Sequence, residues 1–319
     1  MKTVITDRSL SLFPLTEQVS PNHIRSYIEA VRDAGIKYIE LDFRTVMKMQ
    51  ELPDGIKYIF RVTDPTFAYL ADAFDFDYML VTLSDLRRPV NTSVPVIAEV
   101  PGMGVSPGLI NMITEQTGGK LAMIRLRGHY PMMTQIQALQ YINGLRALVT
   151  VPVDICPMNN RRTALDTAIK FSLIGADSIS MTIGTSRNYV SFEEFLFTLM
   201  SVYDTIPKEF DMSSVCRAAL LHNIIFRNSE DSIPRIMRLL DRDISGLINV
   251  DTGERVKLHV ALRDTQYLHR TFVSALERLA QEESIPPDIL QDMTDAIRHY
   301  NVGLFSDKII QPEKKGLLN

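Results

Sequence analysis

The sequence is poor in the residue types that metal centres, disulfide frameworks and phosphate loops require. Its 319 residues include two cysteines, Cys156 and Cys216, and six histidines. Two cysteines exclude a disulfide framework and a zinc cluster built from repeated cysteine pairs, and a histidine-rich site would use most of the histidines. Only 15 residues are glycine, which leaves little material for glycine-rich phosphate loops.

A surplus of positive charge and a long apolar run are also lacking. The chain has 34 basic and 38 acidic residues and a formal net charge of −4, so no basic field attracts nucleic acid or anionic lipid. No apolar run approaches the roughly 18–20 residues of a membrane span, and the first residues lack the apolar core of a signal peptide. We therefore expect a cytoplasmic protein that binds neither nucleic acid nor a membrane.

A regular alternation of strand and helix patterns fills the first 205 residues. Each unit has a short apolar run, a polar loop and an amphipathic stretch of helical length. The expected helices lie near 20–35, 66–73, 105–117, 134–148, 162–174 and 191–203, and the links after the second and fourth strands are too short for a full helix. The expected strands lie at 3–6, 37–41, 57–62, 77–83, 94–100, 121–127, 151–156 and 177–183.

Eight strand–helix units predict an α/β fold, a (β/α)8 TIM barrel over residues 1–205. An open doubly wound sheet is the alternative, but residues 6–14 contain no glycine, so the dinucleotide-binding fingerprint is absent. Residues 206–319 predict a mainly helical accessory region, with helical apolar spacing at 217–226, 232–247, 266–284 and 287–300.

Polar residues at the carboxyl ends of the expected strands are the candidates for function, because a TIM barrel carries its active site there. Arginines suit carboxylate or phosphate recognition, since the guanidinium fork binds two oxygens. Glu40 and Glu99 lie within apolar strands, where a carboxylate needs a partner, so a structural ion pair and a catalytic role both stay open. The candidates are Asp7, Arg8, Glu40, Arg61, Glu99, Arg125, Arg127, His129 and Thr182.

Two side chains, His129 and Cys156, each allow more than one interpretation. His129 follows a strand, where an imidazole can act as a general acid or base, although a loop histidine is commonly solvated. Cys156 closes a strand and can be a soft metal ligand, a nucleophile or a buried structural thiol. Met158, two residues later, is a poor ligand for hard divalent ions.

Residues 153–184 carry the most specific pattern. The segment reads VDICPMNNRRTALDTAIKFSLIGADSISMTIG. Three elements of one barrel family have counterparts in it: Asn159 falls in its HxHND strand end, residues 175–177 match its GAD element, and Gly184 opens the place of its glycine-rich loop. Glu193 and Glu194 match the paired glutamates that follow in that family. The segment resembles the metal-dependent barrels of homocitrate synthase, isopropylmalate synthase and hydroxymethylglutaryl-CoA lyase.

Other elements are similar to the same family. Asp7 and Leu10 match two residues of its DTTLRDG opening, Glu40 matches the glutamate of its second strand, and Arg125 matches the arginine of its fifth-strand element. In this family a divalent metal polarises an α-keto acid, which an enolised acyl-CoA thioester attacks.

The departures from the family fall on its metal site. Cys156 and Met158 replace the two histidines, Ser11 and Leu12 replace the Arg-Asp pair of the opening, and residues 128–129 replace the fifth-strand Asp-Thr. The resemblance implies a divalent metal cofactor, but these losses would remove the activation of the electrophile. We therefore expect the metal site to be dismantled, with Cys156 and Met158 in the places of the histidines.

The resemblance implies a homocitrate-synthase-like acyltransferase. One form of such a protein is a subunit of a two-component homocitrate synthase, of the kind that serves nitrogenase cofactor assembly. Its ligands would be a small carboxylate or α-keto acid and an acyl-CoA, and its partner would be a related subunit in a homodimer or heterodimer. The implied catalytic residues are Asp7, Glu40 and His129. The implied substrate-binding residues are Arg8, Arg61, Glu99, Arg125, Arg127 and Thr182.

Two alternatives stay open. The first is a catalytically silent barrel that binds a small carboxylate or regulates an active homologue, which the missing metal ligands favour. The second is a metal-independent aldolase or lyase on the same scaffold, although no expected strand ends in a lysine that could form a Schiff base.

Overall fold

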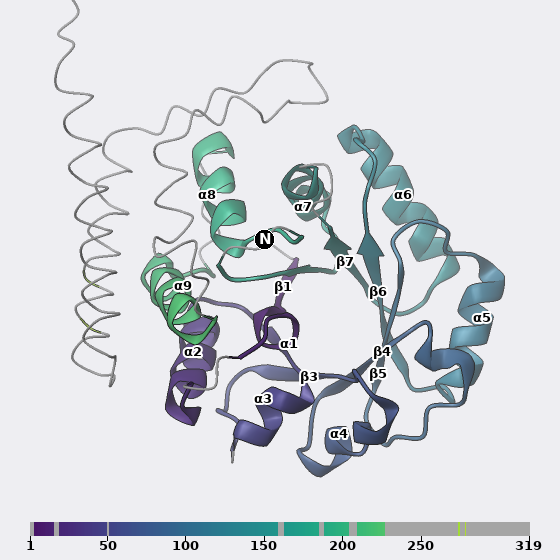
Figure 1. Cartoon of the computed structure of the whole chain (residues 1–319). Coiled ribbons are helices and arrows are strands. Elements are labelled where there is room, and N and C mark those ends of the chain that lie inside the picture. Colours follow the sequence, from purple (N-terminus) through teal and green to yellow (C-terminus); the bar gives the residue numbers. More distant parts are fainter. Residues whose placement is uncertain are drawn as a thin grey trace, which may run out of the picture.

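Eight parallel strands form a closed barrel in this computed structural model (Figure 1). The structure describes residues 3–226, apart from 16–18, 50, 159–162, 185–187 and 204–208, together with residues 274 and 278. The strands pair in sequence order, and each overlaps one of the expected runs, which confirms the TIM barrel. They are β1 (Val4–Asp7), β2 (Tyr38–Leu41), β3 (Lys57–Arg61), β4 (Tyr78–Thr82), β5 (Val96–Pro101), β6 (Leu121–Gly128), β7 (Val153–Pro157) and β8 (Ser178–Met181).

Helices surround the barrel and connect its strands (Figure 1). They are α1 (Ser9–Leu12), α2 (Pro21–Asp33), α3 (Phe43–Lys48), η1 (Pro65–Phe67), α4 (Leu70–Ala73), η2 (Asp85–Arg87), α5 (Pro107–Gln116), α6 (Gln135–Leu148), α7 (Ala164–Leu173), α8 (Phe192–Tyr203) and α9 (Met212–Phe226). The short α3 and η2 confirm the short links expected after the second and fourth strands. A single helix near 66–73 is wrong, because Asp64 caps a separate 3-10 turn, η1, before the one turn of α4.

Helix α2 forms as its sequence predicts. The Ser20 side chain accepts a hydrogen bond from the His23 backbone N–H, and Pro21 occupies the first helical position. Gly35 follows the helix with a φ of +94°, and a Cβ there would lie 2.1 Å from the carbonyl oxygen of Glu209. Glycine is therefore required where α2 turns into β2, both for the left-handed conformation and for the close approach of another segment.

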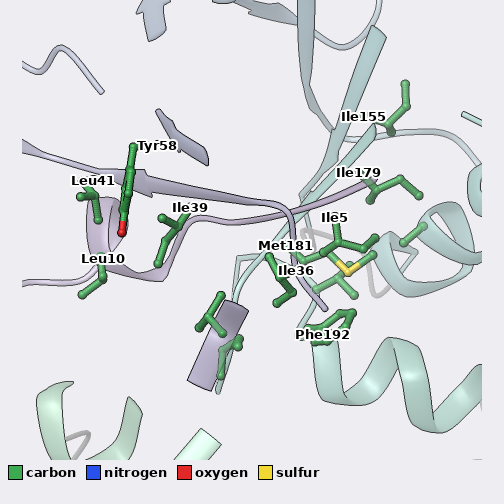
Figure 2. Close-up of a cluster of buried hydrophobic side chains, with 14 of the residues drawn as sticks. Ile5, Leu10, Ile36, Ile39, Leu41, Tyr58, Ile155, Ile179, Met181 and Phe192 are labelled. Atoms are coloured by element: carbon green, nitrogen blue, oxygen red, sulfur yellow. The ribbon is translucent and has the colours of Figure 1, made fainter. Parts of the chain in front are cut away.

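The main core lies between the strands and the surrounding helices. Alternate strand residues point outward, so that Ile5, Ile39, Ile155 and Ile179 pack in one buried cluster with helical side chains such as Phe192 (Figure 2). This burial fixes the outward face of each strand. It thereby also fixes which residues point into the barrel.

The barrel interior combines an apolar and a polar region. Strands β3 to β6 supply a small apolar cluster of Ile59, Leu80, Ile97 and Met123. Strands β1, β7 and β8 instead supply polar groups. Thr6 Oγ1 lies 3.4 Å from Ser178 Oγ, and Ser180 Oγ donates to Asp154 at 2.6 Å. Polar side chains thus occupy positions that branched aliphatic residues fill in many TIM barrels.

Helix α9 packs beside α2 (Figure 1). It contains the first helical pattern expected after the barrel, at 217–226, whereas those expected at 232–247, 266–284 and 287–300 lie outside the described residues apart from the isolated residues 274 and 278. The division into units of 1–205 and 206–319 stays a prediction. Over the part of the chain that the structure describes, no helix combines the length and apolarity needed to cross a membrane.

Candidate functional site

Charged side chains from five strands, together with Arg8 directly after β1, converge inside the barrel near its carboxyl end. The pairing register places Arg125 of β6 between Glu99 of β5 and Asp154 of β7. The other members come from β2, β3 and the residue after β1. We call this set the arginine–carboxylate network. It consists of Arg8, Glu40, Arg61, Glu99, Arg125, Arg127 and Asp154.

Glu40 contacts three guanidinium groups. One of its oxygens accepts from Arg8 Nε at 3.2 Å and from Arg125 Nη1, and the other accepts from Arg61 Nη1 at 3.1 Å and from Ser11 Oγ at 2.5 Å. Burial would raise the pKa of Glu40, but Arg8, Arg125 and Arg61 hold that pKa well below its ordinary value. Glu40 is thus an ionised ion-pair partner, as its place in an apolar strand indicated. Such a carboxylate is a weak base, and its catalytic role stays a prediction.

Glu99 is held in a similar way. Its carboxylate accepts from Arg8 Nη2 at 3.1 Å, from Arg61 Nη2 at 2.9 Å and from Arg127 Nη1 at 3.3 Å. Burial opposes ionisation, but Arg8 and Arg61, with Arg125 nearby, lower the pKa of Glu99 to about 2. Glu99 therefore carries a full negative charge at neutral pH.

Arg125 and Asp154 form a fully buried pair of the network. Arg125 Nε donates to Asp154 Oδ2 at 2.5 Å, and Ser180 Oγ donates to the same oxygen. Arg125 Nη2 and Asp154 Oδ1 are buried without a hydrogen-bond partner among the described residues. Buried polar atoms of this kind are normally satisfied by water or by a ligand.

The network has a surplus of positive charge. Four guanidinium groups face three carboxylates, which leaves one formal positive charge without a partner inside this set. A buried charge is costly unless a counter-charge compensates it. The network therefore favours the approach of an anion.

The divalent metal implied by the family resemblance does not fit the described residues. Arg8 Nη1 donates to Cys156 Sγ at 2.6 Å, and burial raises the pKa of Cys156 to about 11 in spite of Arg8 and Arg125, so the thiol is neutral. The donor atoms of Glu40 and Glu99 are already occupied by guanidinium groups. Within the described ranges, no group of three or more His, Cys, Asp or Glu side chains is placed to hold an ion.

A pocket opens at the carboxyl ends of β4 to β7, directly above the network. Its volume is about 430 Å³. Arg127 is the network guanidinium that reaches it, since the Arg127 side chain is 35% exposed, whereas those of Arg8 and Arg125 are 0% exposed. The lining residues are Thr82, Leu83, Ser84, Glu99, Val100, Pro101, Arg127 and Met158.

Tyr189 covers the network from the side of β8. The centre of its ring lies 5.1 Å from the guanidinium carbon of Arg8 and 5.9 Å from that of Arg127, distances at which a cation is attracted to an aromatic face. An isolated bridge to Met158 anchors the backbone of Tyr189. Sequence reasoning missed this residue, and its one signal was a lone aromatic in the loop where the resembling family has glycines.

Three predicted site residues lie away from the network. Asp7 points outward, where Oδ1 accepts from the Ser9 N–H at 3.0 Å and Oδ2 from the Tyr27 hydroxyl at 2.8 Å. Thr182 is buried and its hydroxyl donates to the Val190 carbonyl at 3.4 Å. His129 is exposed beyond the end of β6, with Nδ1 3.1 Å from the Met158 carbonyl oxygen. The roles predicted for these three residues stay predictions.

A second group of buried titratable side chains surrounds Asp7. Glu193 Oε1 accepts from the Gly184 N–H at 2.8 Å, while its Oε2 is buried without a hydrogen-bond partner in the described ranges. Burial raises the pKa of Glu193 to about 7, and it also raises the pKa of Asp7. Burial lowers the pKa of His222, on α9, to about 3. This group lies between the barrel and its outer helices, so it is separate from the pocket.

Comparison with known proteins identifies the fold. No family model matches the chain, and no curated protein matches it in sequence. Solved HMG-CoA lyases share its fold. The Brucella melitensis enzyme is 14% identical, with a TM-score of 0.53, and the match covers 71% of this chain and 99% of that one. The Pseudomonas aeruginosa enzyme is 13% identical, with a TM-score of 0.51, and the match covers 70% of this chain and 92% of that one. An Acinetobacter baumannii HMG-CoA lyase solved with coenzyme A and 3-methylmalate has 12% identity and a TM-score of 0.52, over 69% and 90%.

Proposed function

We propose that this protein binds a small carboxylate at the carboxyl end of its barrel and does so without a divalent metal. The observation that carries the proposal is the unmatched positive charge of the arginine–carboxylate network, which Arg127 brings to the wall of a pocket of about 430 Å³. Guanidinium groups bind carboxylates through paired hydrogen bonds. The Arg127 side chain is 35% exposed and lines the pocket, so a ligand can reach it there.

Calorimetric titration of the metal-free protein tests this proposal. After treatment with a chelator, we expect a panel of short carboxylic acids to include at least one that binds, with an affinity that added Mg²⁺ or Mn²⁺ leaves unchanged. Arg127→Gln should weaken that binding at least tenfold. Arg146→Gln, which makes the same charge change at a half-exposed arginine on α6, should not. Binding that appears only with added metal would contradict the proposal.

A second candidate function is homocitrate-synthase-like condensation of an acyl-CoA with an α-keto acid, as one subunit of a homodimer or heterodimer. Its support is the shared fold with HMG-CoA lyases, one of which was solved with coenzyme A and a carboxylate. The assay is release of free coenzyme A from acetyl-CoA with a panel of α-keto acids, with and without a related subunit. Absence of keto-acid-dependent release in both settings would remove this candidate and leave the carboxylate-binding barrel.

A further inference from the structure

The charges around the pocket limit the charge of its ligand, and this step rests on the proposed function. Among the described lining residues, Arg127 is the one cation and Glu99 is the one anion. The other network arginines lie beneath the pocket wall, with side chains that are 0 to 10% exposed and hydrogen-bonded to Glu40, Glu99 or Asp154. One guanidinium is therefore available to a ligand.

Glu99 acts against a second negative charge on the ligand. Its carboxylate lines the same pocket and keeps its charge at neutral pH, because three arginines surround it. A ligand carboxylate can approach Arg127 and compensate the surplus positive charge of the network. A second carboxylate in a pocket of this size would lie near Glu99 without a cation of its own, and like charges at short distance repel.

The rest of the pocket suits an uncharged remainder. Leu83, Val100 and Met158 provide apolar wall, while Thr82 Oγ1 and Ser84 Oγ, 2.6 Å apart, provide hydroxyl groups. Thr82 also donates to Asp85 Oδ2 at 2.6 Å, which adds negative charge at this end. A short aliphatic or hydroxylated chain fits these surfaces.

We infer that the pocket selects short monocarboxylates against dicarboxylates. The carboxylate pairs with Arg127, and the remainder of the ligand lies between the apolar wall and the Thr82 and Ser84 hydroxyl groups. Selection arises from charge: the network has one more guanidinium than carboxylates, so one ligand carboxylate balances it, and Glu99 repels a second.

Matched pairs of acids test the inference. Titration calorimetry at pH 7 should give binding of lactate at least tenfold tighter than that of malate, and of butyrate at least tenfold tighter than that of succinate. Ser84→Lys places a second cation at the far end of the pocket, at an exposed position. It should strengthen the binding of malate relative to lactate and of succinate relative to butyrate. Leu173→Lys, which adds the same charge at an exposed position of α7 outside the pocket, should leave the preference unchanged.

The outcomes separate this inference from the proposed function. Dicarboxylates that bind as tightly as the monocarboxylates, with Arg127→Gln weakening both, would overturn the charge selection and leave carboxylate binding in place. Binding of neither class by the folded wild-type protein would overturn both proposals. A Ser84→Lys variant that folds and binds dicarboxylates no better would show that charge does not set the selectivity.

Discussion

Glu40 is a fully buried carboxylate whose two oxygens are shared among three arginines and a serine. Its charge holds together Arg8, which follows β1, and the arginines of β3 and β6. The net stability of a buried ion pair is often small, because desolvation offsets attraction, but removing one member leaves the others buried and uncompensated. The consequence should appear in the stability of the fold.

We expect Glu40→Gln to lower the free energy of unfolding by about 3 kcal/mol or more, within the range for breaking buried ion pairs. Urea denaturation followed by circular dichroism measures the change. Glu115→Gln, which neutralises an exposed glutamate on α5, is the control and should change stability by less than about 0.5 kcal/mol. Equal stability of the two variants would show that the charge of Glu40 does not hold the network together.

At the scale of elements, the turn after β8 is fitted against α9. Gly184 has a φ of +74°, and a Cβ built on it would lie 2.3 Å from His222 Nδ1. The His222 ring packs against Phe13 and Phe226, at centroid distances of 5.3 and 4.5 Å. Gly184 therefore meets two constraints at once, a left-handed backbone and contact with the imidazole.

A double-mutant cycle separates these two constraints. Gly184→Ala should cost more than about 2 kcal/mol, whereas in a His222→Ala background the same change should cost only the backbone strain of about 1–2 kcal/mol. Gly175→Ala is the matched control, because Gly175 has a φ of +77° and no atom within 4 Å of an added Cβ. If His222→Ala leaves the cost of Gly184→Ala unchanged, the close contact does not limit this position.

Periodicity explains why the strands and most helices could be predicted. Outward residues such as Ile39 and Ile179 are buried against helices, so each strand keeps an apolar face that is visible in the sequence. Helix α2 also shows its cap residues in the sequence. The single turn α1 was missed, and the 3-10 turn η1 and the single turn α4 were predicted as one helix near 66–73, because elements this short contain no full period.

At the scale of the whole molecule, the sequence predicted which arginines and glutamates lie at the strand ends, but not how they pair. Burial alone left an ion pair and a catalytic role equally open for Glu40, and the choice depends on distances between strands remote in sequence. The outward direction of Asp7 and the position of Tyr189 over two arginines are likewise properties of the closed barrel. A polar residue at a strand end carries no local signal of the neighbours it will meet.

Two sets of buried carboxylates should give the whole molecule an asymmetric dependence of stability on pH. Arginines lower the pKa of Glu40 and Glu99 inside the barrel, whereas burial raises the pKa of Asp7 and Glu193 outside it. A carboxylate whose pKa is lowered by folding stabilises the protein at any pH above its unfolded-state pKa. That stability is lost as the pH falls through its folded-state pKa. The inner set therefore predicts a loss of stability below about pH 4.5, continuing towards pH 2.

The outer set acts in the opposite direction. In the unfolded chain Glu193 ionises near its ordinary pKa of 4.5, but in the folded protein its pKa is about 7, so stability falls between these two pH values and levels off above pH 7. A shift of this size corresponds to about 3 kcal/mol. Glu193→Gln keeps an acceptor for the Gly184 N–H and cannot ionise, so it should flatten the slope and stabilise the protein at pH 8. Urea denaturation of both proteins from pH 4 to pH 8 measures this, and parallel profiles would show that Glu193 titrates normally.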